Sequence, residues 1–151
     1  MKICVYTIEK KKSDFFSKII DNQKNMIQKY AQIEEIALFN KKVSAAQNRD
    51  AIMAKESYTE VFSPYMKGKS IALHPEGKVL DSFEFSKIFD TSVVLNFFIA
   101  GAYGFEERFL ERADAVVSLS HLTFSHKIAK VVLYEQIYRA LTIQNKHPYH
   151  K

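Results

Sequence analysis

The sequence predicts an α/β fold built around a mostly parallel central sheet. Short segments rich in β-forming residues alternate with segments whose apolar residues recur at helical spacing, and this alternation continues along the whole chain. Residues 93–100 (VVLNFFIA) are apolar at nearly every position, which is typical of a strand that helices cover on both faces. No repeat, linker or low-complexity segment interrupts the 151 residues, so one domain over residues 1–151 is expected.

The first half of the chain contains the patterns of two strands and two helices. Residues 2–8 alternate and favour a strand. A helix is expected from about residue 14 to residue 30, because Ser13 and Asp14 can cap it and apolar residues follow at helical spacing. A second strand and a second helix follow, and the predicted segments are residues 33–39 for the strand and residues 44–61 for one continuous helix.

The second half of the chain continues the alternation with shorter elements. Asp81 or Ser82 can cap the first of its helices, and glycines interrupt the chain directly after the most apolar strand. The predicted segments are, in order, a short buried strand at 70–73, a turn at 74–77 (HPEG), a helix to 89, a strand at 93–100, a glycine-containing break at 101–104, a helix at 105–112, a strand at 115–119, a loop at 120–126 and a helix at 127–145.

The final predicted helix is apolar around most of its circumference. Because one covering layer buries only one stripe of a helix, further cover is needed, and a second copy of the chain is its expected source. Tyr134 and Tyr138 are expected to lie in the core or in that subunit seam. Glu135 and Arg139 stand four residues apart and can form an ion pair on the polar face.

The charge balance favours a polyanionic partner. Lysine and arginine number 22 against 17 acidic residues, which gives a net charge of +5. The segment from residue 127 to residue 151 is the most basic, with five basic residues against one acid, and it ends in the sequence HPYHK. The shorter lysine runs at residues 10–12 and 41–42 are expected to be solvated surface.

The composition also excludes several classes of protein. The four glycines form neither a G-x-G-x-x-G fingerprint nor a phosphate-binding Walker loop. The one cysteine, Cys4, excludes an internal disulfide and fits a reducing, cytoplasmic compartment. No apolar run approaches the roughly 20 residues of a membrane span, so no membrane partner is expected. His147 and His150 lack a third ligand, so no metal site is predicted.

Three loops are candidates for a ligand site. Ligands of an open α/β sheet bind beyond the carboxyl ends of its strands, and the loops that follow predicted strands begin at Leu73, at Ala100 and at Ser120. Glycines directly after a buried strand, as in residues 100–104 (AGAYG), allow a ligand to approach the backbone closely.

Four motifs in the last third of the chain resemble the family of the ribosomal RNA large-subunit methyltransferase H, which belongs to the SPOUT class. The motifs are residues 97–104 (FFIAGAYG), 118–126 (SLSHLTFSH), 138–140 (YRA) and 147–151 (HPYHK). The resemblance implies a SPOUT-type α/β knot, with a C-terminal trefoil knot around the sheet, and a homodimer. It also implies S-adenosylmethionine as the cofactor and methylation at N3 of a pseudouridine in the 23S rRNA of the assembled ribosome.

The resemblance also implies which residues hold the cofactor. They come from the three candidate loops, and they are Leu73, Ala100, Gly101, Gly104, Leu119, Ser120, His121, Leu122, Thr123 and Phe124. The family usually has two glycines where this chain has Ala100 and Gly101, and Ala100 would be strained if that position required a positive φ. A Gly101→Val substitution is expected to obstruct the cofactor and leave the fold intact.

The chemistry of the reaction indicates candidate catalytic residues. The N3–H of a uracil-type base is a weak acid, so a base, or a cation that stabilises the imide anion, helps the in-line transfer of a methyl group. The available groups of this kind are His126, Arg139, Tyr149 and His150. The C-terminal tail is expected to close over the site, on the partner subunit, and to touch RNA.

Purely structural roles for these residues stay open, and so do two other functions of the protein. His126 can be a structural residue at a helix start, Arg139 can merely pair with Glu135, and His74 and His121 are expected to pack or to bond the backbone. The chain could instead be a non-catalytic protein of ribosome binding or assembly with the same fold. It could also be a SPOUT enzyme that acts on tRNA.

Overall fold

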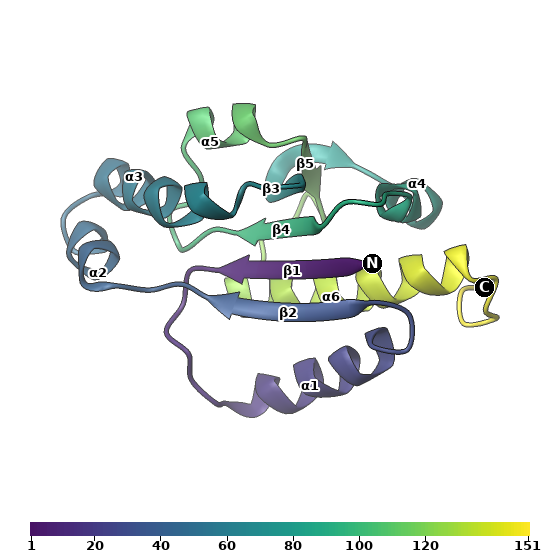
Figure 1. The fold of residues 1–151 in the computed structure, drawn as a ribbon. Coiled ribbons are helices and arrows are strands. Elements are labelled where there is room, and N and C mark those ends of the chain that lie inside the picture. The colour runs from purple at the N-terminus through teal and green to yellow at the C-terminus, as the bar shows by residue number, and fades with distance from the viewer.

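The computed structural model describes residues 1–151 and contains one sheet of five strands, all of them parallel (Figure 1). The strand order is β2-β1-β4-β3-β5. The strands are β1 (Lys2–Thr7), β2 (Gln32–Ala37), β3 (Lys69–Val79), β4 (Leu95–Ile99) and β5 (Ala115–Ser118). The predicted α/β class with a mostly parallel sheet is confirmed, and the carboxyl ends of β3, β4 and β5 meet at one edge.

Helices cover both faces of the sheet. They are α1 (Phe15–Ile27), α2 (Lys41–Gln47), α3 (Ala51–Phe62), α4 (Ser82–Ser86), α5 (Glu107–Arg112) and α6 (His126–Gln144), with 3₁₀ turns at Ser63–Tyr65 and Lys87–Phe89. Side chains from α1, α4 and α6 share one core with the sheet, and side chains from α2, α3 and α5 share the other. None of these helices combines the length and the apolar character that crossing a membrane requires.

The apolar strand β4 shows why both faces need cover. Neighbouring residues of a strand point to opposite faces, so Phe97 and Ile99 lie in the α1/α4/α6 core while Phe98 lies in the α2/α3/α5 core. All three are buried. The nearly continuous apolar run therefore fits a central parallel strand, as predicted.

The predicted helix over residues 44–61 is wrong, because this segment contains the end of α2 and all of α3 except its last residue, Phe62. Residues 48–50 interrupt it. The Asp50 carboxylate accepts a hydrogen bond from the backbone N–H of Met53 at 2.7 Å and begins a new helix. The first helix also begins earlier than expected, at a cap in which the Asn40 side chain accepts from the Val43 N–H at 2.8 Å. Local capping thus overrides the continuous apolar spacing.

The predicted turn at residues 74–77 is also wrong, because β3 continues through it. Its register against β5 shifts between Leu73 and Lys78, so the intervening residues form an irregularity within the strand. Gly77 passes so close to β5 that a Cβ on it would lie 2.8 Å from the Val116 carbonyl oxygen. The HPEG segment therefore bends the strand at the sheet edge, where Figure 1 shows it curling.

The helix α6 receives more cover from its own chain than the sequence suggested. It packs against α1, α4 and the sheet, and Tyr134 and Tyr138 are buried in the core. Apolar exposure persists near its start, where Ile128 is 40% exposed. A second copy of the chain is therefore not needed to cover most of this helix.

A buried ion network anchors α6 to the sheet. The Lys130 ammonium lies 2.6 Å from the Glu9 carboxylate, after β1, and 3.1 Å from the Glu35 carboxylate on β2. The Tyr134 hydroxyl donates a hydrogen bond to Glu35 at 3.1 Å, and Lys24 of α1 pairs with the same carboxylate. Burial by itself raises the pKa of Glu9, but hydrogen bonds from His126 and Lys130 outweigh it and lower the pKa to about 2.

We expect Glu9→Gln to lower the free energy of unfolding by about 2 kcal/mol at pH 7, because it leaves a buried Lys130 ammonium with one carboxylate fewer. The folded pKa of Glu9 lies below its ordinary value, so its contribution is present above about pH 4.5 and is lost as the pH falls toward 2. Urea unfolding at a series of pH values should therefore show the two proteins converging in acid. Glu34→Gln, in an exposed pair with Lys2, is the matched control and should change little. A pH-independent difference would contradict the assignment.

Candidate functional site

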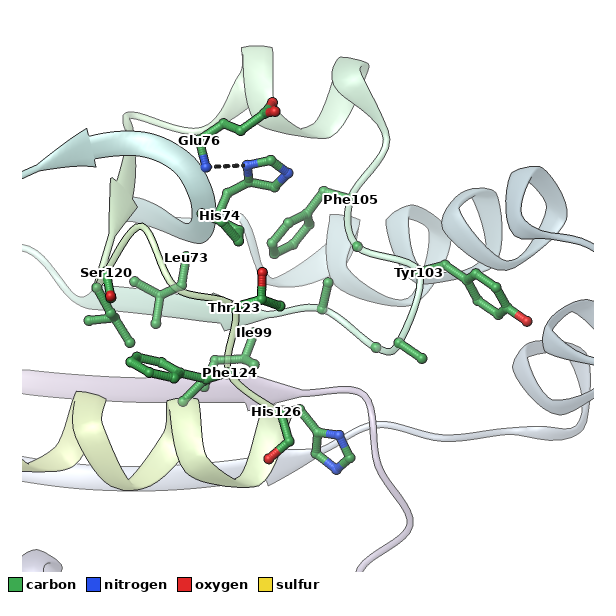
Figure 2. Close-up of a pocket in the computed structure, with 18 of the residues that line it drawn as sticks. Leu73, His74, Glu76, Ile99, Tyr103, Phe105, Ser120, Thr123, Phe124 and His126 are labelled. Atoms are coloured by element: carbon green, nitrogen blue, oxygen red, sulfur yellow. Dashed lines mark hydrogen bonds between the residues drawn. The ribbon is translucent and has the colours of Figure 1, made fainter.

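A cavity of about 710 Å³ opens where the bend within β3 and the carboxyl end of β4 meet the loop that follows β5 (Figure 2). This volume lies within the range of small-molecule and cofactor sites. Figure 2 shows Leu73, Ile99 and Phe124 close together at its centre, with Thr123 and Phe105 above them and His126 at its lower rim. Its apolar wall thus comes from three segments that are distant in sequence, which are the middle of β3, the end of β4 and the loop after β5.

Most of the residues that the resemblance implied for cofactor binding line this cavity. They are Leu73, Ala100, Gly101, Gly104, Leu119, Ser120, Leu122, Thr123 and Phe124. His121 does not line it, and its side chain is exposed. All three candidate loops therefore converge on one place, as the position of the strand ends predicted.

The candidate loops also contained His74, Ala102, Tyr103 and Ser125, which line the cavity as well. The sequence did not indicate five other lining residues, which are Pro75, Glu76, Ile99, Phe105 and Ala129. Pro75 and Glu76 belong to the bend of β3, which looked like a separate turn. His74 acts on the backbone, as expected, since its Nδ1 accepts a hydrogen bond from the Glu76 N–H at 3.1 Å (Figure 2). Ile99 ends an apolar strand, and its position there is the signal that could have included it.

The helices α2 and α3 support the loop 100–104 through contacts with Tyr58 and Gln47. A Cβ on Gly101 would lie 2.5 Å from the hydroxyl oxygen of Tyr58, which is buried on α3 and hydrogen-bonded to Gln47. The Tyr103 hydroxyl lies 3.5 Å from the Gln47 carbonyl oxygen, and Figure 2 shows its ring pointing away from the cavity. The backbone of Ala100 does not have a positive φ, so the strain considered for an alanine there does not arise.

This packing overturns one expectation. A Gly101→Val side chain would meet the Tyr58 ring, so the prediction that this substitution leaves the fold intact is wrong. Its expected effect on cofactor binding stays a prediction. Gly104 differs, because its φ is +80° and a Cβ there would meet nothing within 4 Å. The two glycines of the loop are therefore needed for different reasons, close packing at Gly101 and backbone conformation at Gly104.

The loop after β5 is fixed by its own serines. The Ser118 hydroxyl donates to the Ser120 carbonyl oxygen at 2.8 Å, and the Ser120 hydroxyl accepts from the Leu122 N–H at 3.0 Å. Ser125 then caps α6 through the Ile128 N–H. These bonds leave Leu122 exposed over 74% of its surface and turn Thr123 and Phe124 into the cavity.

The four candidate catalytic residues lie in two groups. His126 begins α6 at the cavity, with its Nε2 3.4 Å from the Glu9 carboxylate. Arg139, Tyr149 and His150 gather near the other end of the same helix. At about 1.5 Å of rise per residue, roughly 20 Å of helix separates His126 from Arg139. The structure thus does not bring all four together within one chain.

The second group is tied together by Glu135. Its carboxylate accepts from the Arg139 guanidinium at 2.8 Å and from the Tyr149 hydroxyl at 3.0 Å. The guanidinium also lies 3.1 Å from His150 Nδ1 and 4.9 Å from the centre of the Tyr149 ring. Partial burial of Tyr149 and its bond to Glu135 raise the pKa of its phenol. Arg139 therefore does more than form the predicted ion pair with Glu135.

The tail reaches this group by a sharp turn after α6. Lys146 has a φ of +54°, and the His147 N–H donates to the Thr142 carbonyl oxygen at 2.9 Å, which closes the helix end. The His150 ring then packs edge-on against Phe83 with ring centres 5.0 Å apart. The C-terminal residues are folded back against the helix rather than extended away from it.

Comparison with known proteins shows the family to which this chain belongs. The family model described as "Predicted SPOUT methyltransferase" matches residues 1–150, and the chain belongs to this SPOUT methyltransferase family. Its curated relatives include two proteins named ribosomal RNA large subunit methyltransferase H. The protein from Aliarcobacter butzleri (strain RM4018) is 46% identical, and the protein from Campylobacter jejuni subsp. jejuni serotype O:23/36 (strain 81-176) is 48% identical. Each match covers 151 residues and 100% of both chains, so the chain is a member of the methyltransferase H family.

A solved structure agrees with this fold. The structure described as a "probable methylase family protein from Haemophilus influenzae Rd KW20" has a TM-score of 0.55 to this chain at 12% identity. The match covers 99% of this chain and 70% of that one. At this identity the likeness concerns the fold alone.

We expect Gly101→Ala to lower the free energy of unfolding by about 1–3 kcal/mol, because its methyl group overpacks against Tyr58. A double-mutant cycle with Tyr58→Leu tests the contact. The double variant should be more stable than the sum of the two single losses, by at least about 1 kcal/mol. Gly104→Ala, measured in the same cycle by urea unfolding, is the control. Its loss of unfolding free energy and that of Tyr58→Leu should simply add in the double variant. Additive losses at Gly101 would show that Tyr58 does not support the loop.

Proposed function

We propose that this protein is an S-adenosylmethionine-dependent methyltransferase that methylates N3 of a pseudouridine in the 23S rRNA of the assembled ribosome. The observation that carries the proposal is the full-length identity of 46–48% to the relatives named above. The cavity formed by the bend of β3 and the loops after β4 and β5 supports it, because it supplies a ligand site at the expected edge of the sheet. The proposed location is the cytoplasm, where the free, buried thiol of Cys4 is stable.

The residues of the cavity fit a nucleoside-containing methyl donor. Leu73, Ile99 and Phe124 supply apolar surface for an adenine ring, and the backbone of the loops 100–104 and 119–125 supplies donors and acceptors for its edge and for polar groups. S-adenosylmethionine, when bound, supplies a methyl group carried on a positively charged sulfur. The contribution of the chain is to hold the target nitrogen in line with that group and to keep water away.

We further propose that the last third of the chain forms a trefoil knot around this cavity. The strand β5 lies at the sheet edge beyond β3, yet α6 crosses toward the opposite edge, where Lys130 meets Glu9, after β1, and Glu35 on β2. The connecting loop shares the cavity with the loop 100–104. A threaded path would hold both loops against each other, which explains how loops of this length form a defined wall.

The proposed assembly is a homodimer in which the tail of one subunit acts at the cavity of the other. Roughly 20 Å of helix separates Arg139, and with it Tyr149 and His150, from His126 within one chain. These residues are therefore too far from the cavity of their own subunit to contact a substrate bound there. The exposed side chains of Leu122 and Ile128 adjoin the cavity and offer an apolar contact for a second copy. In this arrangement each site is composed of a cavity from one subunit and a tail from its partner.

The proposed roles of the tail residues follow from their charges and hydrogen bonds. The Arg139 guanidinium can stabilise the imide anion that forms when the base loses its N3 proton. Because a guanidinium only donates, His150 Nδ1 accepts from it, and this bond orients the ring so that Nε2 can contact the substrate. Glu135 holds both Arg139 and Tyr149 in place. His126, held by Glu9, is the proposed contact on the cavity side.

We expect S-adenosylmethionine to bind with a Kd in the micromolar range in isothermal titration calorimetry, because the cavity has the size and apolar lining of a cofactor site. Thr123→Trp, which fills the cavity from its upper wall, should weaken binding at least tenfold. Absence of binding at millimolar cofactor would favour the non-catalytic function in ribosome binding or assembly. Transfer of tritiated methyl groups to tRNA rather than to ribosomes would favour the other alternative.

We expect removal of residues 147–151 to leave cofactor affinity nearly unchanged and to lower turnover on ribosomes at least about 100-fold, because it removes two of the proposed catalytic residues. Mixed dimers give a sharper test. Subunits without the tail, combined with Thr123→Trp subunits, should regain part of the activity that each lacks alone. If the truncated protein keeps its turnover, or if mixing restores nothing, the composite site is refuted.

A further inference from the structure

The segment that joins β1 to α1 carries an unusual surface. Phe15, at the first position of α1, is 76% exposed, and its ring stacks on Phe16 with centres 4.2 Å apart. Ile19 lies one turn further along the helix and is 43% exposed. Phe16 is partly covered, whereas the Phe15 ring gains little for folding at this exposure, and exposed apolar patches often mark an interaction site.

The lysines beside this aromatic pair leave an excess of positive charge. Lys10, Lys11 and Lys12 are exposed and come before it in the sequence, separated from it by Ser13 and Asp14. The nearby carboxylates are largely neutralised by lysines of α6. Asp14 pairs with Lys127, and Glu9 and Glu35 pair with Lys130. Asp21 is the remaining acid on the small cavity of about 250 Å³ beneath the lysines. Lys11 and Lys12 have no carboxylate within 4 Å.

This surface is continuous with the rim of the cofactor cavity. Glu9 directly precedes the lysines and contacts His126, which lines the cavity. The next residue of α6, Lys127, lies 5.9 Å from the centre of the Phe16 ring and bonds to Asp14 at the start of α1. An extended ligand that enters the cavity past His126 would therefore pass directly over these lysines and the exposed Phe15 ring.

We propose that residues 10–19, here named the α1 ledge, bind unpaired RNA that flanks the target nucleotide. The inference rests on the proposed function and adds a contact surface to it. Single-stranded nucleic acid is held by aromatic faces on which bases stack and by lysines that meet phosphates. The α1 ledge supplies Phe15 for the first contact and Lys11 and Lys12 for the second. A second copy of the chain would use the apolar side chains but would gain nothing from the lysines.

The stacking contact is tested with Phe15→Ala. The expected result is a rise in the KM for ribosomes of at least about fivefold, because stacking one base on an aromatic ring contributes roughly 1–3 kcal/mol. Cofactor affinity and turnover at saturating ribosomes should stay within twofold of the unaltered protein, since Phe15 does not line the cavity. Sedimentation should show the same oligomeric state. An unchanged KM, or dissociation of a dimer, would overturn the proposal.

The phosphate contacts are tested with Lys11→Ala/Lys12→Ala. Equilibrium binding to ribosomes without cofactor, measured over a range of salt concentrations, should show a logarithmic slope that is shallower by about 1.4, because two phosphate contacts are lost. Lys41→Ala/Lys42→Ala is the matched control. It removes the same charge from α2, on the opposite face of the sheet, and should not change the slope. Equal effects of both pairs would mean nonspecific attraction and would overturn the proposal.

The two experiments also separate this proposal from the proposed function. If the unaltered protein methylates ribosomes and both α1-ledge variants behave normally, the ledge is refuted and the function stands. If the unaltered protein transfers no methyl group to ribosomes, the function fails, and the binding slopes still decide whether the ledge holds RNA.

Discussion

The anchoring of α6 by Lys130 is the interaction on which the rest of the site depends. The ammonium is nearly buried between the carboxylates of Glu9 and Glu35, so the helix has one energetically acceptable position across β1 and β2. That position puts the first residue of α6 at the cavity and directs its last turns past the amino ends of β1 and β2, as Figure 1 shows. Both groups of candidate catalytic residues are therefore placed by one buried ion network.

The cavity depends in the same way on support from the other face of the sheet. Loops at the ends of parallel strands usually have few internal contacts, yet the loop 100–104 rests on the buried Tyr58 ring and reaches Gln47 through Tyr103. The helices α2 and α3 thus support one side of this loop, and the other side of the loop lines the cavity. This explains why a segment far in sequence from the motifs of the last third of the chain contributes to the site.

A site divided between two ends of one helix has a consequence for function. A single chain can offer a cavity and a cationic tail, but it cannot apply them to the same substrate atom. Use of a partner's tail would make the enzyme active only as an assembled dimer. It would also leave the surface around each cavity open to a large substrate, and the α1 ledge extends that surface with groups suited to RNA.

The sequence predicted the class of fold well, because alternation of apolar strands and helical spacing is a local property of the chain. It also predicted the three loops of the cavity, since the carboxyl ends of neighbouring parallel strands meet at one edge. It failed where contacts that are distant in sequence decide the outcome. The bend of β3, for example, depends on the close passage of Gly77 along β5. The break between α2 and α3 is a different case, because it depends on a local cap at Asp50 that the continuous apolar spacing concealed.

The residue types of the site were therefore determined by the sequence alone, and so was the family, through motifs such as residues 118–126 and 147–151. Only the tertiary structure decided which of these residues meet. It joined Leu73, Ile99 and Phe124 in one wall, and it separated His126 from Arg139 along a rigid helix. The physical reason is that hydrophobic spacing and hydrogen-bond caps act between neighbours in the chain, whereas burial of Lys130 and of Tyr58 requires partners that only the folded chain brings together.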